Sequence, residues 1–202
     1  AAERAEIYNN FRNLYYGTGE PDKAIGFYTK GLEIAEMYDL KNQIINFIGN
    51  IGLIHDQQGN TPKALVYYKR ALKLNEEVGN KKGMVNNLTN IGGVYYTEKK
   101  FDQAIDYYTK AMTICEEIDY KYGLATNLTN LGFIYNEQVQ LDKAQQTFER
   151  ALQLVTEINK LEDIKFLHLT LSQLCEHRGQ TQKALDHYKA YDAAKDSLLN
   201  EE

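Results

Sequence analysis

The chain has little cysteine or proline and no tryptophan: two cysteines and two prolines among 202 residues. The cysteines lack a Cys-x-x-Cys spacing, which excludes a disulfide framework and the common zinc and redox motifs. Cys115 and Cys175 are therefore predicted to be small buried residues. No apolar run approaches the roughly 18 residues that a membrane span needs. Direct insertion of this segment into a membrane is not expected.

An excess of positive charge is also missing. The 23 basic and 28 acidic residues give a net charge of -5, opposite in sign to the footprint of a nucleic-acid binder. Nucleic acid is therefore not an expected partner. Hydrophobic residues make up 43% of the chain and charged residues 25%, as in ordinary soluble proteins. The segment is expected to be soluble and to form a packed core.

Motifs for catalysis and metal binding are absent too. Carboxylates are spread through the chain rather than paired, and there is neither a phosphate-binding glycine loop nor a nucleophile elbow. The four histidines never form a His-x-x-x-His pair, and His55 and His168 fall where a packed histidine is expected. The sequence predicts no enzyme activity, no metal site and no cofactor.

A small residue returns every forty positions. An aromatic residue follows each one after four positions, and a second small residue follows after three more until Tyr191 replaces it in the last copy. Spacings of four and three place all three positions on one stripe of a helix, where small residues admit a neighbouring helix and the ring fills the remaining gap. The first series is Ala24, Ala64, Ala104, Ala144 and Ala184, and the aromatic series is Tyr28, Tyr68, Tyr108, Phe148 and Tyr188.

Another small position lies twelve residues before four of these alanines, each time after an apolar residue. Glycine inside a helix costs about 1 kcal/mol relative to alanine, so its regular return needs a packing reason. We expect that reason to be close contact between paired helices. The positions are Gly52, Gly92, Gly132 and Ser172.

Turn signals such as Gly59 before Thr61-Pro62 divide the pattern into helical hairpins. The fold class is predicted to be all-α, with five helix-turn-helix repeats at about 1–40, 41–80, 81–120, 121–160 and 161–202 forming one domain over 1–202. In the first repeat, Arg12 takes the small position, as expected of a cap. The predicted helices are 2–16, 21–37, 42–58, 62–78, 82–97, 101–118, 121–138, 141–158, 161–178 and 181–199.

The order of these residues resembles the tetratricopeptide repeats, shown most fully by Leu128, Leu131, Gly132, Tyr135, Ala144, Phe148 and Ala151. The resemblance implies a right-handed superhelix whose first helices line a concave groove. The forty-residue period is similar to the longer-helix members found in kinesin light chains and bacterial signalling proteins. Residues 187–202 resemble the end of the repeat region in bacterial sensor histidine kinases and helix-turn-helix regulators. That likeness implies a periplasmic location if the kinase reading holds, and a cytoplasmic one otherwise.

A second stripe on each first helix lies opposite the packed one and is predicted to face the groove. It carries a ladder of primary amides, Asn50, Asn90 and Asn130. Each amide both donates and accepts hydrogen bonds, which suits the backbone of an extended peptide. The alternative is that the amides bond across adjacent first helices and stiffen the stack. The predicted partner-binding residues are Asn46, Asn50, Leu53, Asn86, Asn90, Tyr96, Thr126, Asn130, Phe133 and Glu137.

The sequence as a whole favours a non-catalytic module that binds a protein or peptide segment in its groove. The resemblance implies the sensor or regulatory part of a larger bacterial signalling protein. The alternative is a stand-alone scaffold or adaptor that assembles a complex. The pattern identifies neither the partner nor the oligomeric state.

Overall fold

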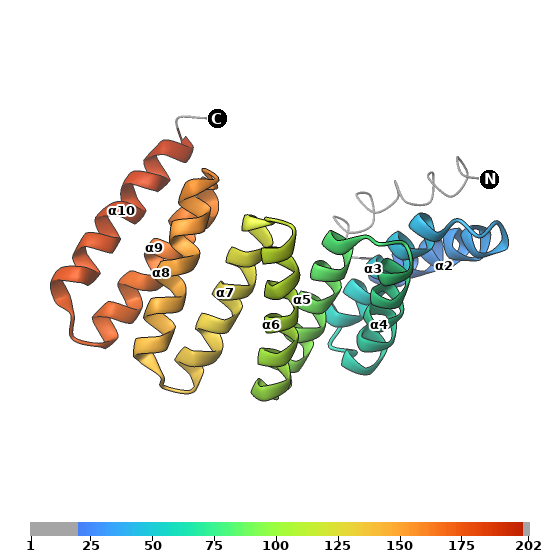
Figure 1. The fold of residues 1–202 in the computed structure, drawn as a ribbon, viewed down its shortest axis with the longest axis horizontal. Helices are drawn as coiled ribbons and strands as arrows, with labels where there is room; N and C mark the ends of the chain where they lie inside the picture. Colours follow the sequence, from blue (N-terminus) through green and yellow to red (C-terminus); the bar gives the residue numbers. More distant parts are fainter. Residues whose placement is uncertain (1–19, 200–202) are drawn as a thin grey trace. The chain divides into compact units, whose positions relative to one another are not determined.

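The structure, a computed structural model, describes residues 20–199. Within that range the chain folds into nine α-helices and no strand (Figure 1), which confirms the all-α class. The predicted helix 2–16 and the cap at Arg12 lie outside the described residues. The helices are α2 (Pro21–Met37), α3 (Lys41–Gln57), α4 (Thr61–Glu77), α5 (Lys81–Thr97), α6 (Phe101–Glu117), α7 (Lys121–Glu137), α8 (Leu141–Glu157), α9 (Leu161–His177) and α10 (Thr181–Leu199).

Every described helix begins and ends within one residue of its predicted bounds. The helices α2 to α9 have 17 residues each, and three residues separate each helix from the next. One helix and one turn therefore make a half-repeat of twenty residues, and two make the forty-residue period read from the sequence. No described helix is both long and apolar enough to cross a membrane.

The three-residue turns share one backbone geometry. The middle residue has a positive φ, from 49° at Asp39 to 72° at Gly59. The next residue then donates its N–H to the carbonyl five positions back, as Asn60 does to His55 at 2.8 Å and Gln140 does to Tyr135 at 2.8 Å. This αL ending satisfies carbonyl groups that the last helical turn leaves free.

Val139 is the unusual residue in this set, because its φ is 59° although its side chain is β-branched. A positive φ costs a residue with a Cβ about 1–2 kcal/mol. Replacing Val139 by glycine removes this strain, although the greater freedom of glycine in the unfolded chain offsets part of the gain. The net expected result is a free energy of unfolding higher by about 1 kcal/mol. Urea denaturation followed by circular dichroism measures the change.

The matched control is Val78→Gly, because Val78 also follows a helix but has a φ of -92°. There the substitution removes no strain and is expected to destabilise. A Val139→Gly protein that is less stable than wild type would contradict the strain at this turn.

The described helices group into two compact bodies, an N-terminal one of α2 to α5 and a C-terminal one of α6 to α10. In the N-terminal body α3 packs on α2, and α4 packs on both α3 and α5. In the C-terminal body α7 packs on α6, α8 packs on both α7 and α9, and α10 packs on α9. The single array over 1–202 stays a prediction.

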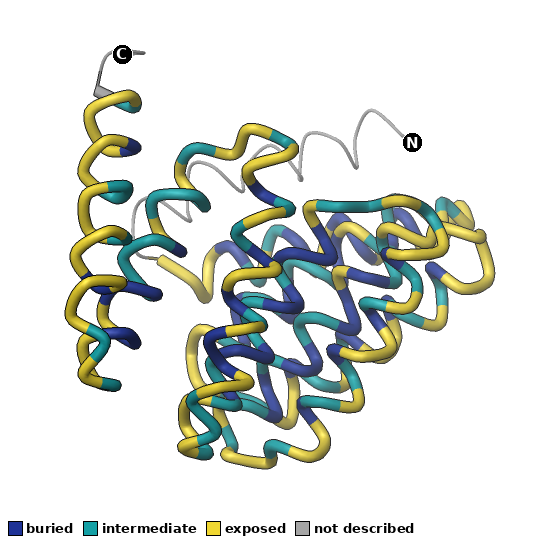
Figure 2. The backbone as a smooth tube through the Cα atoms, turned by 60° about the vertical axis from the view of Figure 1, so that its left-hand side comes forward, coloured by how far each residue is buried: buried dark blue, intermediate teal, exposed yellow. Residues whose placement is uncertain are grey.

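The core follows the two stripes read from the sequence, and buried positions recur along each helix in Figure 2. Among the repeating alanines, Ala64 and Ala144 are fully buried. The aromatic residue after them is buried as well, with Tyr68 at 0% and Phe148 at 1% exposure, whereas Tyr188 in α10 is 52% exposed. Both cysteines are free and buried, as predicted, and burial raises the pKa of the Cys115 thiol to about 11.

Close helix approach explains the recurring glycines. A Cβ on Gly52 would lie 3.0 Å from the Tyr68 ring, and one on Gly132 would lie 2.5 Å from the Phe148 ring. Real Cβ atoms essentially never come as close as 2.5 Å, so a side chain at position 132 would force the Phe148 ring to move. At position 52 the contact would be tighter than most, and the Tyr68 ring would have to move by a few tenths of an ångström. In the last repeat Ser172 takes this place, and its hydroxyl donates to the Ala184 carbonyl at 2.8 Å.

Ion pairs connect successive second helices. Arg70 of α4 pairs with Glu36 of α2. Eighty residues later, Arg150 of α8 pairs with Glu116 of α6 at 3.3 Å. All four side chains are about half exposed. Exposed pairs of this kind stabilise a fold by less than about 1 kcal/mol each.

A histidine pair joins α9 to α10. The Nδ1 atoms of His168 and His187 lie 3.1 Å apart, which places one N–H between them. Burial lowers the pKa of both imidazoles, and His187 lowers that of His168 further. For His187, Glu149 and Asp186 raise the pKa and Lys183 lowers it, without reversing the effect of burial. Protonating both rings would remove the acceptor and set two cations against each other.

The melting temperature is therefore expected to fall as the pH drops from about 7.5 to about 5.5. Because the folded pKa values lie below the unfolded value of 6.5, the unfolded chain binds more protons in this window. The contribution of the two histidines to stability is fully present above pH 6.5, and it is lost as the pH falls through their folded pKa values. Differential scanning calorimetry across the pH range measures the slope.

The double variant with glutamine at His168 and His187 is the control for this pH dependence. It is expected to melt with a shallower pH slope and to keep only the part from His55, whose pKa burial also lowers. An unchanged slope would show that the α9–α10 pair does not couple folding to protonation.

Candidate functional site

The predicted groove stripe of the N-terminal body is open to solvent along α3 and α5. Asn46 and Asn86 are exposed, and Asn50, Leu53, Asn90 and Tyr96 are partly exposed. The opposite stripe of α3 is buried, and its Ile48 and Ile51 side chains are at most 1% exposed. The stripe predicted to face a groove is therefore open to solvent and the opposite one is buried, and partner binding by the open stripe stays a prediction.

In the C-terminal body the corresponding stripe of α7 lies against α9. Two pockets open along this boundary, and residues of α7, α8 and α9 line both. Thr126 and Asn130 line the smaller pocket, and Phe133 lines the larger one. The predicted Glu137 is exposed at the end of α7 and lines neither. We call the two pockets and the surface between them the α7–α9 groove.

The smaller pocket, of about 130 Å³, lies beside the first half of α7. Its walls combine aromatic and polar groups, with buried Val155 of α8 among them. The Nζ of Lys160 lies over the Tyr122 ring, 5.8 Å from its centroid. The lining residues are Tyr122, Ala125, Thr126, Thr129, Asn130, Val155, Asp163, Phe166 and Leu167.

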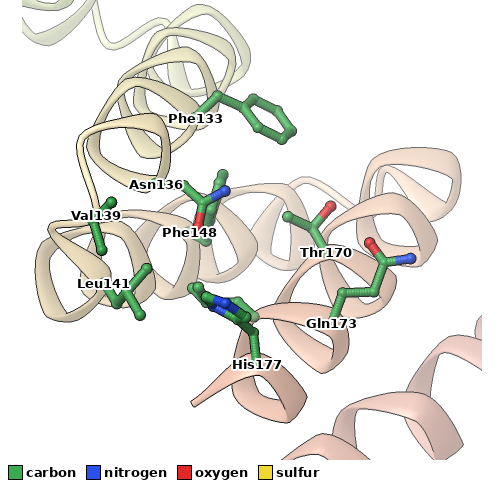
Figure 3. A pocket seen from close by; sticks show the side chains of 9 residues that line it. Phe133, Asn136, Val139, Leu141, Phe148, Thr170, Gln173 and His177 are labelled. Atoms are coloured by element: carbon green, nitrogen blue, oxygen red, sulfur yellow. The ribbon is translucent and has the colours of Figure 1, made fainter.

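The larger pocket, of about 330 Å³, lies beside the last turns of α7 and α9 (Figure 3). Apolar side chains from all three helices line it, and polar side chains join them at Asn136, Thr170 and Gln173. Val139, the residue with the unfavourable φ, also lines this pocket and is 73% exposed. The full lining is Phe133, Asn136, Val139, Leu141, Phe148, Thr170, Gln173, Leu174 and His177.

An aromatic contact lies between the two pockets. The ring centroids of Phe133 and Phe166 are 6.1 Å apart, and Phe133 also meets Phe148 edge to face at 5.2 Å. Phe133 lines the larger pocket and Phe166 the smaller one. The two rings therefore join the pockets into one groove with an apolar centre.

Sequence reasoning missed the α9 side of this groove. Those residues stand forty positions after predicted α7 residues: Phe166 after Thr126, Thr170 after Asn130, Gln173 after Phe133 and His177 after Glu137. Their residue types differ from those on α7, so only the forty-residue register could have found them. Asp163 has no predicted counterpart, because Gly123 stands forty residues before it.

The electrostatics of the smaller pocket centre on Asp163. Burial raises the pKa of its carboxyl, the Lys160 ammonium lowers it, and Glu162 raises it. The neighbouring Glu162 instead forms a 2.6 Å ion pair with Lys165 and is 71% exposed. Asp163 is thus a partly buried carboxylate in a pocket that Tyr122 and Phe166 also line, where a positive charge would be stabilised.

A third pocket, between α8 and the start of α10, is polar, and hydrogen bonds between its own side chains already span it. Arg178 bonds both Asp142 and Gln145 there. Elsewhere in the described part of the chain, no three histidine, cysteine or acidic side chains gather closely enough to hold a metal ion. The α7–α9 groove is therefore the candidate site.

Several solved structures with this fold match nearly the whole chain. BtubC from P. vanneervenii matches with a TM-score of 0.80 at 20% identity, covering 98% of this chain and 89% of that one. A putative kinesin light chain from Podosopora anserina, with nearly identical TPR-like repeats, matches with a TM-score of 0.73 at 11% identity, covering 96% of both chains. At these identities the likeness concerns the fold.

A Rap protein complexed with competence and sporulation factor matches with a TM-score of 0.70 at 16% identity, covering 99% of this chain and 66% of that one. The chain thus spans slightly less than two thirds of the Rap protein. A search of curated proteins finds no match.

Helical hairpins stacked at a fixed period, with an open stripe on their first helices, define an α-solenoid of the protein-interaction class. The tetratricopeptide repeat model matches residues 43–117, 83–157 and 123–195 in overlapping register. The chain belongs to the tetratricopeptide repeat family. The repeats of this family support a protein–protein interaction module.

Proposed function

We propose that this chain is a non-catalytic module that binds an extended peptide segment of a partner along the open stripes of its first helices. The observation that carries the proposal is the α7–α9 groove, where predicted residues Thr126, Asn130 and Phe133 line two adjoining pockets. Amide and hydroxyl groups there suit a peptide backbone, and the aromatic contact suits its side chains.

The role that fits this binding best is the sensor or regulatory part of a larger bacterial signalling protein. Support comes from the Rap protein complexed with competence and sporulation factor, of which the match covers 66% of the chain. A stand-alone scaffold is the second candidate, favoured by the kinesin light chain repeats that this chain matches over 96% of their length. An output domain encoded after Glu202 would support the first role, and a stop codon there would support the second.

The test of peptide binding is a selection of random twelve-residue peptides displayed on phage against the immobilised chain. Recovered peptides are synthesised, and their dissociation constants are measured by fluorescence anisotropy. Changing Asn50, Asn90 and Asn130 together to alanine is expected to weaken binding more than tenfold, since each amide hydrogen bond contributes about 1 kcal/mol. Failure to recover any binding peptide would sink the proposal.

The control variant changes three exposed amides on second helices, Gln103, Gln153 and Gln182, to alanine. It is expected to bind the same peptides with unchanged affinity. If the asparagine variant keeps its affinity but melts lower than this control, the ladder is structural and binding uses other groups.

A further inference from the structure

The two pockets of the α7–α9 groove differ in chemistry, and this difference specifies more than a generic peptide. The lining of the smaller pocket includes the carboxylate of Asp163, whereas the lining of the larger one includes no acidic side chain and has Phe133, Leu141 and Phe148 at one end. Their positions along α7, near Thr126 and near Asn136, differ by about ten residues at most. With a rise of 1.5 Å per residue this is up to about 15 Å along α7, and the separation of roughly eight residues on α9 gives about 12 Å.

We propose that the α7–α9 groove selects an extended peptide with a basic side chain for the Asp163 pocket and a large apolar side chain, about four residues away, for the Phe133–Phe148 pocket. An extended strand advances about 3.3 Å per residue, so four residues span the distance between the pockets. Side chains four apart also point to the same face of the strand. This inference rests on the proposed peptide binding and specifies the chemistry of the peptide.

Charge complementarity identifies the basic side chain. Asp163 lines the smaller pocket together with Tyr122 and Phe166, and an arginine guanidinium in this pocket would contact the carboxylate while stacking on a ring. Tyr122 already has the Lys160 ammonium over its face. Asp163 also lies in the first turn of α9, where a carboxylate favours the helix by itself. The pair of aromatic walls, rather than the carboxylate alone, marks the pocket as a place for a cation.

The backbone at Val139 identifies the apolar side chain. In the other turns between described helices, the residue at positive φ is glycine, aspartate, asparagine or lysine. Only here does a β-branched residue accept that conformation, and its side chain stays 73% exposed at the edge of the larger pocket. Such a residue costs stability and gains nothing from burial in the chain itself. An apolar side chain seated against Val139, Leu141 and Phe148 would cover it.

The experiment uses the phage selection, repeated with two groove variants as counter-targets. Asp163→Asn removes the charge and keeps the shape, and Gln173→Glu adds a charge to the larger pocket at an exposed position. Peptides recovered on the wild type are expected to share arginine or lysine four residues from leucine, isoleucine, methionine or phenylalanine. Both variants are expected to bind such peptides about tenfold more weakly in low salt.

Matched controls make the same chemical changes outside the groove. Asp192→Asn on α10 and Gln103→Glu on α6 alter exposed positions and are expected to leave every dissociation constant unchanged. Exchanging the peptide arginine for citrulline is expected to abolish the effect of Asp163→Asn, because the two changes remove one interaction. Lys160→Gln removes the competing ammonium and is expected to tighten binding of the basic peptide.

Recovered peptides without the basic and apolar spacing would overturn the inference while leaving peptide binding in place. Equal binding to wild type and Asp163→Asn would do the same. Recovery of no peptide at all would remove both the inference and the proposed function.

Discussion

Replacing Ala64 by glutamate is expected to lower the free energy of unfolding by roughly 3–5 kcal/mol. Ala64 is fully buried on α4, which packs between α3 and α5. A glutamate there carries its carboxylate into an apolar contact that holds no cation to receive it, and its four extra heavy atoms force the helices apart. The denaturation midpoint in urea, followed by circular dichroism, measures the loss.

The matched control is Val66→Glu, two residues along the same helix, where the side chain is 66% exposed. That change is expected to stay within about 0.5 kcal/mol of wild type. The Ala64→Glu deficit should also shrink near pH 5, because a buried carboxyl is cheaper to keep in its protonated form. Equal stability of the two variants would show that the buried stripe of α4 is assigned wrongly.

Truncating Phe148 to alanine is the second large effect, with an expected loss of about 3–5 kcal/mol. Phe148 is 1% exposed, meets Phe133 edge to face and occupies the space left open by Gly132. Removing the ring leaves a cavity beneath the larger pocket of the groove. Guanidinium denaturation of the purified variant gives the stability difference.

Tyr188 offers a control at the same place in the repeat, forty residues later. It is 52% exposed, because no helix in the described chain covers that face of α10. Tyr188→Ala is therefore expected to cost less than about 1 kcal/mol. A loss at Tyr188 as large as that at Phe148 would mean that the last hairpin is covered in solution, for example by a second copy of the chain.

The helices and the core were predictable because several local signals agree. Alanine, aromatic and glycine positions recur at one period, and each defines the same buried stripe. The turn at Val139 shows how far this register reaches: valine gives no turn signal, yet the predicted boundary between 138 and 141 is correct within one residue. Consistency between repeats overrode the local preference of one residue.

The candidate site was predictable only on one side. The stripe on α7 followed from its position opposite the buried one, but the partners from α9 depend on which side chains two neighbouring helices bring together. The contact of Phe133 with Phe166 joins residues 33 positions apart, and that of His168 with His187 joins residues nineteen apart. Neither spacing is a helical period, so the forty-residue register could place Phe166 on the open stripe but could not predict its contact with Phe133. The pocket that Asp163 shares with Tyr122 and Phe166 likewise exists only in the folded chain.

The twenty-residue half-repeat has a consequence for how such a chain changes its length. Because every junction between described helices is the same three-residue αL turn, a recombination event that inserts or deletes forty residues rejoins two equivalent turns. The helices on either side of the new junction then pack against neighbours of the same kind as before. A lineage of such chains can therefore gain or lose whole hairpins, and with them open surface on the first helices, while the remaining hairpins keep the same core contacts.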